Sequence, residues 1–353
     1  MTMEFITLTK TDPDFDSYLR GTFSTDFRAV PIETYHAQTA RERVTFRVIP
    51  VAKVEAPAWW KIYFWSCRPE LLGLTLGPSV AAWLNHPGAL AEWTRWPSWF
   101  ALVGVFFLHT AVFLFNDVQD HVQGFDRSNR RRGSQVIQKG WVSASHMQRW
   151  GWVNLGLAAL FGVPAFSNAP AMLALICGMA ALALAVLFRN RWTRWGFVDL
   201  ALLALFGPLL TMGISLASFG LTDGRDVLLG LALGSLTVWA LQTRQLENLF
   251  RSRPEGFHTF LAYCDFDRAR ALCIAQGILL LAIQPAVALA LNVPLKMFAL
   301  LPLVCIPLIL WMGRLWRAAS PLSSSLLNSD AWALGAHLAW TVWWVLALGV
   351  MWL

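Results

Sequence analysis

The sequence predicts an all-α protein, a polytopic membrane bundle of about nine transmembrane helices. Hydrophobic residues make up 56% of the 353 residues and charged residues only 14%, and the mean hydropathy is +0.50. A soluble domain of this length would carry far more charge. Several apolar stretches also reach the roughly 20 residues that a helix needs to cross a hydrocarbon core about 30 Å thick. A transmembrane β-barrel would instead show alternating segments of about ten residues, and the sequence has none.

Apolar stretches after Pro69 define the expected crossings. They are residues 70–86, 98–115, 150–167, 170–188, 197–219, 227–243, 271–291, 295–312 and 333–353.

Lys and Arg are distributed unevenly between the connections of such a bundle. With the N-terminus in the cytoplasm, sixteen of the 28 basic residues fall in connections on the cytoplasmic side and nine in the segment before the first crossing. Only Arg95, Arg225 and Lys296 fall on the other side. This asymmetry predicts a multi-pass protein of the cytoplasmic (inner) membrane with a cytoplasmic N-terminus. The net charge of +7 then reflects topology and contact with anionic lipids. Nucleic acid is not an expected partner, because no basic run is interleaved with aromatic residues on a soluble module.

Residues 1–57 are polar and are expected to form a cytoplasmic segment before a transmembrane domain at residues 58–353. The alternating run from Val44 to Val48 predicts a short strand within this segment. The first twenty residues have neither a basic leader nor an apolar stretch, so we expect no signal peptide. The aromatic and basic stretch from Trp59 to Trp65 is suited to a helix that lies in the lipid headgroup layer.

The strongest functional signal follows the second expected crossing, where Asn116, Asp117, Asp120 and Asp126 stand close together. Asn116 and Asp120 are four residues apart and therefore share one helical face. Such carboxylates repel one another unless a cation neutralises them, and hard oxygen ligands suit Mg²⁺, which commonly bridges carboxylates to substrate phosphates. A solvated loop of mixed charge is the alternative, but acids at the end of a membrane helix are costly and usually functional.

Basic residues come directly after this acidic cluster. They are Arg127, Arg130, Arg131 and Arg132. Guanidinium groups match the geometry of phosphate oxygens, so we expect these arginines to grip a diphosphate held next to the metal.

The order of these residues resembles a known motif. Asn116-Asp117-x-x-Asp120, Gly124-x-Asp126 and the run from Gly133 to Ser143 are similar to the first Asp-rich motif of the UbiA superfamily of intramembrane prenyltransferases. Their spacing is most similar to the 1,4-dihydroxy-2-naphthoate polyprenyltransferase branch. Arg68-Pro69 and the stretch from Gly196 to Gly213 agree, so the resemblance covers roughly residue 60 to the end.

The resemblance implies a UbiA-like helix bundle that moves an isoprenoid group from an allylic diphosphate to a small aromatic, quinone-precursor-like acceptor. It further implies Mg²⁺ as cofactor, with the prenyl diphosphate, the acceptor and membrane lipids as partners. Asp117, Asp120 and Asp126 are then catalytic, and Asn116, Asp117 and Asp120 are the metal ligands. The implied substrate-binding residues are Asn116, Arg130, Arg131, Lys139, Arg244, Glu247, Asn248, Arg253, His109 and Asp199.

Two of these residues have equally good structural explanations. His109 lies seven residues before Asn116, on the same side of the helix, where it either orients the acceptor or a metal ligand or simply forms a hydrogen bond in helix packing. Asp199 lies at the start of the fifth expected crossing. It either contacts the acceptor or is an acidic residue stabilised by the dipole of its own helix.

The second Asp-rich motif of the family departs from the pattern in this chain. Alignment on Gly256-x-x-Thr259 puts Asn248 and Ser252 where the two motif aspartates belong. The resemblance therefore leaves two possibilities for the second ion. Either Asn248, Glu247 and Gln245 hold it, or Arg244, Arg251 or Arg253 replaces it, since fixed positive charge does part of the same electrostatic work.

This departure keeps other functions open. The same scaffold is compatible with an intramembrane terpene cyclase or a transferase of another activated diphosphate, and also with a non-catalytic carrier of an isoprenoid or pigment precursor. A secondary transporter is disfavoured, because the sequence has no inverted repeat and its acidic residues lie at a membrane surface.

Overall fold

The computed structural model describes residues 4–37, 39–90, 94–128, 133–187, 197–249 and 260–352. Helices dominate these residues, which confirms the predicted all-α membrane class. The chain divides into two compact units: Met1–Pro69 with Phe106–Leu160, and Glu70–Val105 with Phe161–Leu353. The expected boundary between residues 57 and 58 stays a prediction.

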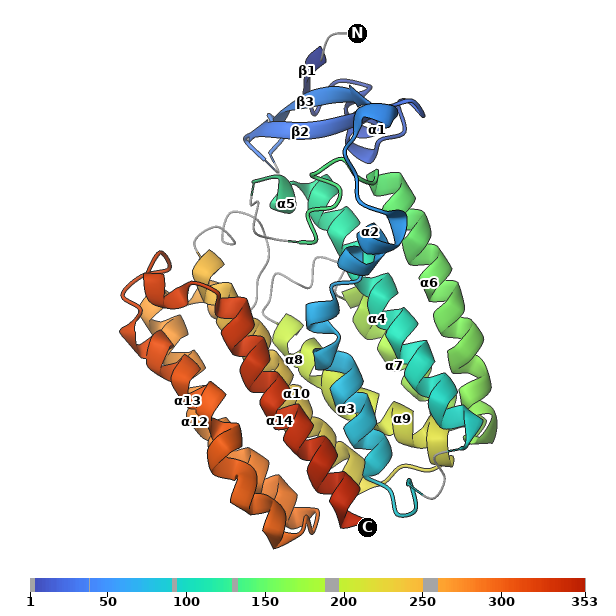
Figure 1. Cartoon of the computed structure of the whole chain (residues 1–353), viewed down its shortest axis with the longest axis vertical. Helices are drawn as coiled ribbons and strands as arrows, with labels where there is room; N and C mark the ends of the chain where they lie inside the picture. Colours follow the sequence, from blue (N-terminus) through green and yellow to red (C-terminus); the bar gives the residue numbers. More distant parts are fainter. Residues whose placement is uncertain are drawn as a thin grey trace. The chain divides into compact units, whose positions relative to one another are not determined.

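The first unit begins with a three-stranded antiparallel sheet (Figure 1). Its elements are β1 (Glu4–Thr9), α1 (Phe15–Arg20), β2 (Phe27–Tyr35) and β3 (Arg43–Pro50). β3 lies in the centre because it pairs with both other strands. Val44 and Phe46 of β3 are completely buried, and Phe15 and Leu19 of α1 pack on them. The alternating run that predicted a strand is therefore confirmed as part of β3. We call residues 4–50 the N-terminal module.

Helices and one long connection complete the first unit. They are α2 (Trp59–Ser66), the second half of α4 (Trp96–Gln123), α5 (Phe125–Ser128), residues 133–143 and the first part of α6 (Ala144–Ala165). Ile62, Leu114, Val136 and Met147 bring α2, α4, the connection and α6 into one apolar core. The connection is thereby anchored beside the end of α4. Trp59 on α2 is 73% exposed, so its position in the headgroup layer stays a prediction.

The second unit is a helix bundle around α10. Its helices are the first part of α4, the end of α6, α3 (Gly73–Leu84), α7 (Ala171–Leu187), α8 (Phe197–Ala204), α9 (Leu210–Phe219), α10 (Gly224–Gln245), α12 (Phe266–Ala290), α13 (Leu301–Arg317) and α14 (Ser329–Met351). α10 packs against α3, α8, α9, α12 and α14, and Figure 1 shows α14 lying along α13. Trp239 of α10 and Trp311, Trp340, Trp343 and Trp344 of α13 and α14 are buried between these helices.

α8 and α9 are joined by a π-helical turn, η5 (Leu205–Leu209), that lies against the backbone of α10. A Cβ atom added to Gly230 would come within 2.6 Å of the Cα atom of Pro208, and one added to Gly234 within 2.7 Å of the carbonyl oxygen of Leu203. Small residues of this kind let membrane helices approach closely. The glycines of α10 therefore fix its packing against η5.

Each of the nine ranges expected to cross the membrane contains a helix in the described residues. Six helices are long and apolar enough to cross: Trp96–Gln123, Val198–Phe219, Gly224–Gln245, Phe266–Ala290, Leu295–Arg317 and Ser329–Met351. Gly73–Leu84 and Ala171–Ala180 are apolar but shorter. α6 is not among the six, because Gln148, Arg149 and Asn154 lower its hydropathy. The structure thus supports an integral membrane protein, and the count of nine crossings stays a prediction.

Candidate active site

The acidic cluster lies at the end of α4 and in α5, inside the first unit. The side chains of Asp117, Asp120 and Asp126 are buried, with exposed fractions of 2%, 3% and 1%. The Asn116 side-chain amide donates a hydrogen bond to Asp120 Oδ2 at 3.0 Å, as their spacing on one helical face predicts. A solvated loop of mixed charge is therefore wrong for these three carboxylates. Burying three carboxylates away from water is energetically costly unless a cation or several hydrogen-bond donors compensate their charge.

Arg68 supplies that compensation from the segment after α2. Its Nη2 atom forms an ion pair with Asp117 Oδ1, while the backbone N–H of Ser134 donates to Asp117 Oδ2 at 3.1 Å. Burial disfavours the charged guanidinium, but the three carboxylates, Asp117 most strongly, hold the pKa of Arg68 above its usual value. Arg68 thus stays a cation inside the cluster.

Arg68 was not among the residues that the sequence assigned to the site. Only its place beside Pro69 had been noted as part of the resemblance. A stronger signal was available, because three acids at a membrane-helix end need a nearby cation and Arg68 is the basic residue closest to the first expected crossing.

The backbone of Gly133 lies against the cluster. Its φ angle is +71°, a left-handed conformation that favours glycine, and an added Cβ atom would clash with Asp126 Oδ2. The next residue, Ser134, donates its N–H to Asp117. The Gly-Ser element of the predicted motif therefore has a structural reason: it brings backbone next to two carboxylates.

Two further predicted site residues lie near the cluster in the sequence and have other contacts. His109 is buried on α4, with its ring centroid 4.4 Å from that of Phe113, and the guanidinium of Arg68 lies 5.6 Å from the Phe113 ring centroid. Phe113 thus lies next to both His109 and Arg68. Lys139 is exposed, and its ammonium lies 4.5 Å from the ring centroid of Trp141. The structure places Lys139 against an aromatic ring instead of a carboxylate.

The other predicted substrate-binding residues belong to the second unit. Arg244 Nε forms an ion pair with Asp330 Oδ1 at 2.6 Å, and Glu247 accepts a hydrogen bond from Ser329 at 3.2 Å. These contacts join the end of α10 to the start of α14. Asn248 follows in a short 3-10 helix, and its side chain is not described.

Asp199 and the remaining arginines complete the set. Asp199 Oδ2 accepts the backbone N–H of Phe260 at 2.8 Å, so this acid in the first turn of α8 holds the chain after the second-motif region. That contact adds to the helix-dipole explanation. Arg130, Arg131 and Arg253 lie outside the described residues.

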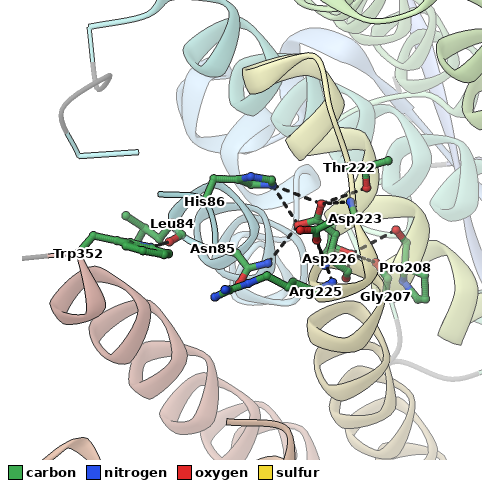
Figure 2. A network of polar contacts seen from close by, with 11 residues as sticks. Leu84, Asn85, His86, Gly207, Pro208, Thr222, Asp223, Arg225, Asp226 and Trp352 are labelled. Carbon is green, nitrogen blue, oxygen red and sulfur yellow. Dashed lines mark hydrogen bonds and ion pairs between the residues drawn. The ribbon is translucent and has the colours of Figure 1, made fainter. Parts of the chain in front are cut away.

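A buried carboxylate of the second unit was not singled out by the sequence. Figure 2 shows Asp226, near the start of α10, receiving hydrogen bonds from Asn85 at 3.1 Å and Thr222 at 3.0 Å. His86 Nε2 lies 3.2 Å from Asp226 Oδ1 and 3.3 Å from Oδ2, and the Thr211 hydroxyl donates to the backbone carbonyl of Asp226 at 2.7 Å. Protein donors satisfy both oxygens, so Asp226 joins the ends of α3, α9 and α10.

The acidic cluster can be tested for its fit to Mg²⁺. Its donors are carboxylate and amide oxygens, the hard ligands that Mg²⁺ prefers. Within the described residues, no three Asp, Glu, His or Cys side chains are arranged to hold a metal by themselves. Mg²⁺ is commonly held by one or two carboxylates together with water and substrate phosphates, so an all-protein cage is not required. Asn116, Asp117 and Asp120 therefore fit an ion that shares its ligands with a diphosphate.

The structure is thus a membrane helix bundle with buried carboxylates and an arginine at one helix end, and known proteins share this arrangement of helices. The model described as the UbiA prenyltransferase family matches residues 75–327, and the chain belongs to this family. This confirms the superfamily that the motif resembled, and the particular branch stays a prediction. No curated protein matches the sequence significantly.

Solved structures show the same fold. A structure described as digeranylgeranylglyceryl phosphate synthase has a TM-score of 0.56 at 13% identity, over 82% of this chain and 99% of that chain. A UbiA homolog from Archaeoglobus fulgidus bound to GPP and Mg²⁺ has a TM-score of 0.56 at 11% identity, with the same coverage. The homolog bound to DMAPP and Mg²⁺ has a TM-score of 0.56 at 13% identity, again with the same coverage.

Proposed function

We propose that this chain is a Mg²⁺-dependent prenyltransferase that moves an isoprenoid group from an allylic diphosphate to a small aromatic, quinone-precursor-like acceptor. The observation that carries the proposal is the buried cluster of Asp117, Asp120 and Asp126 with Arg68 among them. Related folds bound to GPP or DMAPP with Mg²⁺ support the donor class. The positive-inside pattern supports an active site at the cytoplasmic face of the inner membrane.

In the proposed reaction the allylic C–O bond breaks, and the diphosphate leaves with the bonding electron pair. The allylic cation is captured by an electron-rich carbon of the acceptor, which then loses a proton. Asp117, Asp120 and Asn116 would hold Mg²⁺, and the bound ion would supply charge stabilisation to the diphosphate. Arg68 offsets the negative charge of the carboxylates and is held among them by its ion pair with Asp117.

The neutral second motif is the observation that favours a second candidate. Asn248 and Ser252 replace two acids, which weakens the case for an ordinary two-ion site and keeps a terpene cyclase or a transferase of another diphosphate in consideration. In the cyclase case the carbocation would be captured within the isoprenoid itself. The two candidates differ in whether product formation needs an added acceptor.

The deciding experiment incubates membranes containing the chain with a panel of allylic diphosphates, with and without aromatic quinone precursors, and analyses products by mass spectrometry. A prenylated aromatic that disappears in EDTA and returns with Mg²⁺ supports the proposal. A cyclic isoprenoid formed without acceptor supports the second candidate. No product from any donor, with DMAPP still bound, would favour a non-catalytic carrier and overturn the transferase.

A further inference from the structure

The N-terminal module lies outside the family match, which begins at residue 75. It nevertheless belongs to the same compact unit as the acidic cluster. The contacts between the module and the cluster's two flanks are buried, specific and formed by residues that stand next to the acids in the sequence.

The first contact is an ion pair between Glu42 of the module and Arg127, the residue after Asp126. Arg127 Nη2 lies 2.6 Å from Glu42 Oε1, and the side chains are 0% and 2% exposed. The same Nη2 atom also donates to the carbonyl oxygen of Val122 at 3.2 Å. Separating a buried ion pair is energetically costly, because each charge then loses its partner away from water. The contact therefore holds α5, which carries Arg127, against the module. It also commits Arg127 to Glu42 instead of a diphosphate.

The second contact involves His121, the residue after Asp120. Its Nε2 atom lies 3.1 Å from the carbonyl oxygen of Leu19, which is buried in the module's own core. A carbonyl only accepts, so Nε2 carries the hydrogen and Nδ1 is left as an acceptor. Nδ1 lies 3.4 Å from the Nε2 amide nitrogen of Gln138. One imidazole thus links the module, the end of α4 and the connection that carries Ser134.

Two glycines mark further close approaches. Gly21 has a φ angle of +68°, and an added Cβ atom would lie 2.7 Å from the Cβ atom of Ser143. Gly140 has a φ angle of +74°, and an added Cβ atom would lie 2.5 Å from Val30 Cγ2. The module therefore touches residues 133–143 at their far end as well, just before α6.

We propose that the N-terminal module is a positioning element of the active site, which holds the end of α4 and residues 133–143 so that the acidic cluster is ready for Mg²⁺ and a diphosphate. The positioning residues are Glu42 of the module and its contacts outside the module, Arg127 of α5 and His121 of α4. The inference rests on the proposed function for the identity of the ligand. The mechanical part, that the module orders the acidic segment, depends only on the contacts above. Residues that support metal ligands typically contribute about 10–100-fold to metal affinity or activity.

The test uses the purified chain and four variants of it. Glu42→Gln removes the carboxylate that pairs with buried Arg127. Arg127→Gln removes the closer cation of Glu42 and leaves the longer pair with Lys10, whose Nζ lies 3.8 Å from Glu42 Oε2. The double variant removes both buried charges and retains the approximate shape. Asp16→Asn is the matched control, because it removes an exposed ion pair with Arg20 in the same module. Hydrogen exchange of residues 116–143 and binding of Mg²⁺ with inorganic pyrophosphate are measured for each, together with the exchange of α14 as an internal reference.

We expect faster exchange in residues 116–143 and about tenfold weaker Mg²⁺-pyrophosphate binding in both single variants, with α14 unchanged and most of the loss recovered in the double variant. Single variants that behave like Asp16→Asn in both measurements would overturn the proposal. Global acceleration of exchange that includes α14 would also overturn it, because the pair would then support folding alone. Since neither readout requires turnover, failure of prenyl transfer in the wild type would sink the proposed function and leave the positioning role standing.

Discussion

The guanidinium of Arg68 forms a buried ion pair with the carboxylate of Asp117, 49 residues further along the chain. Arg68 belongs to the segment between α2 and α3, and Asp117 to the last turns of α4. The pair therefore joins the residues just before the first expected crossing to those just after the second. It also sets the charge balance of the candidate site.

Arg68→Gln should lower the free energy of unfolding by about 3–5 kcal/mol, because it leaves Asp117 buried without its cation. The double variant Arg68→Gln with Asp117→Asn should recover much of this loss, since neither side chain is then charged. Thermal unfolding of the detergent-purified chain measures both. If the two single effects simply add in the double variant, or if it is even less stable, the pairing is contradicted.

Asp120→Asn should reduce prenyl transfer by about a thousandfold while the amount of protein in the membrane stays the same. A metal that stabilises developing charge contributes several kcal/mol, and each 1.4 kcal/mol corresponds to about a tenfold change in rate. Initial rates with a saturating allylic diphosphate measure the effect, and Asp16→Asn serves as the control. A rate within about twofold of the wild type would remove Asp120 from the metal site.

Gly133→Ala should raise the Mg²⁺ concentration for half-maximal activity by about tenfold, because the added Cβ atom would push against Asp126 and the backbone would have to leave its left-handed conformation. Gly156→Ala is the matched control, since a Cβ atom there meets nothing within 4 Å. The Mg²⁺ concentration for half-maximal activity is the measurement. Equal behaviour of the two variants would mean that the approach of residue 133 to the acid is not required.

Reporter fusions test the orientation of the chain. A reporter inserted beside Arg131 or beside Arg253 should read as cytoplasmic, and one beside Asp223 as external, because the basic connections stay inside. Accessibility of the reporter in intact cells is the measurement. A cytoplasmic reading beside Asp223 would show that the number of crossings before α10 is wrong.

The second-motif region can be given back its acids. Asn248→Asp with Ser252→Asp should lower the Mg²⁺ concentration for half-maximal activity, because Glu247 is otherwise the nearest carboxylate and Arg244 is held by Asp330. The control, Asn248→Gln with Ser252→Thr, changes size without charge. Weaker donor binding in the acidic variant would instead indicate that arginines of this region neutralise the diphosphate. No change in either quantity would remove the region from the active site.

Local patterns in the sequence predicted the features that depend on neighbouring residues. Helical membrane architecture follows from apolar length, strand β3 from alternation, and the Asn116–Asp120 hydrogen bond from a spacing of four. Contacts between distant residues were missed, because hydrophobic periodicity carries no information on partners such as Arg68 with Asp117 or Glu42 with Arg127. The second-motif region was predicted from alignment alone, and Arg253 lies outside the described residues.

The strand order β1-β3-β2 has a consequence for synthesis on the ribosome. The last strand to be made lies between the two earlier ones, so neither β1 nor β2 has its neighbour until residue 50 has left the exit tunnel. Arg127 and His121 emerge only after the first crossings have been made, and they then meet a sheet that can already be complete. Glu42 and the carbonyl oxygen of Leu19 can therefore be in place when Arg127 and His121, their partners, leave the ribosome.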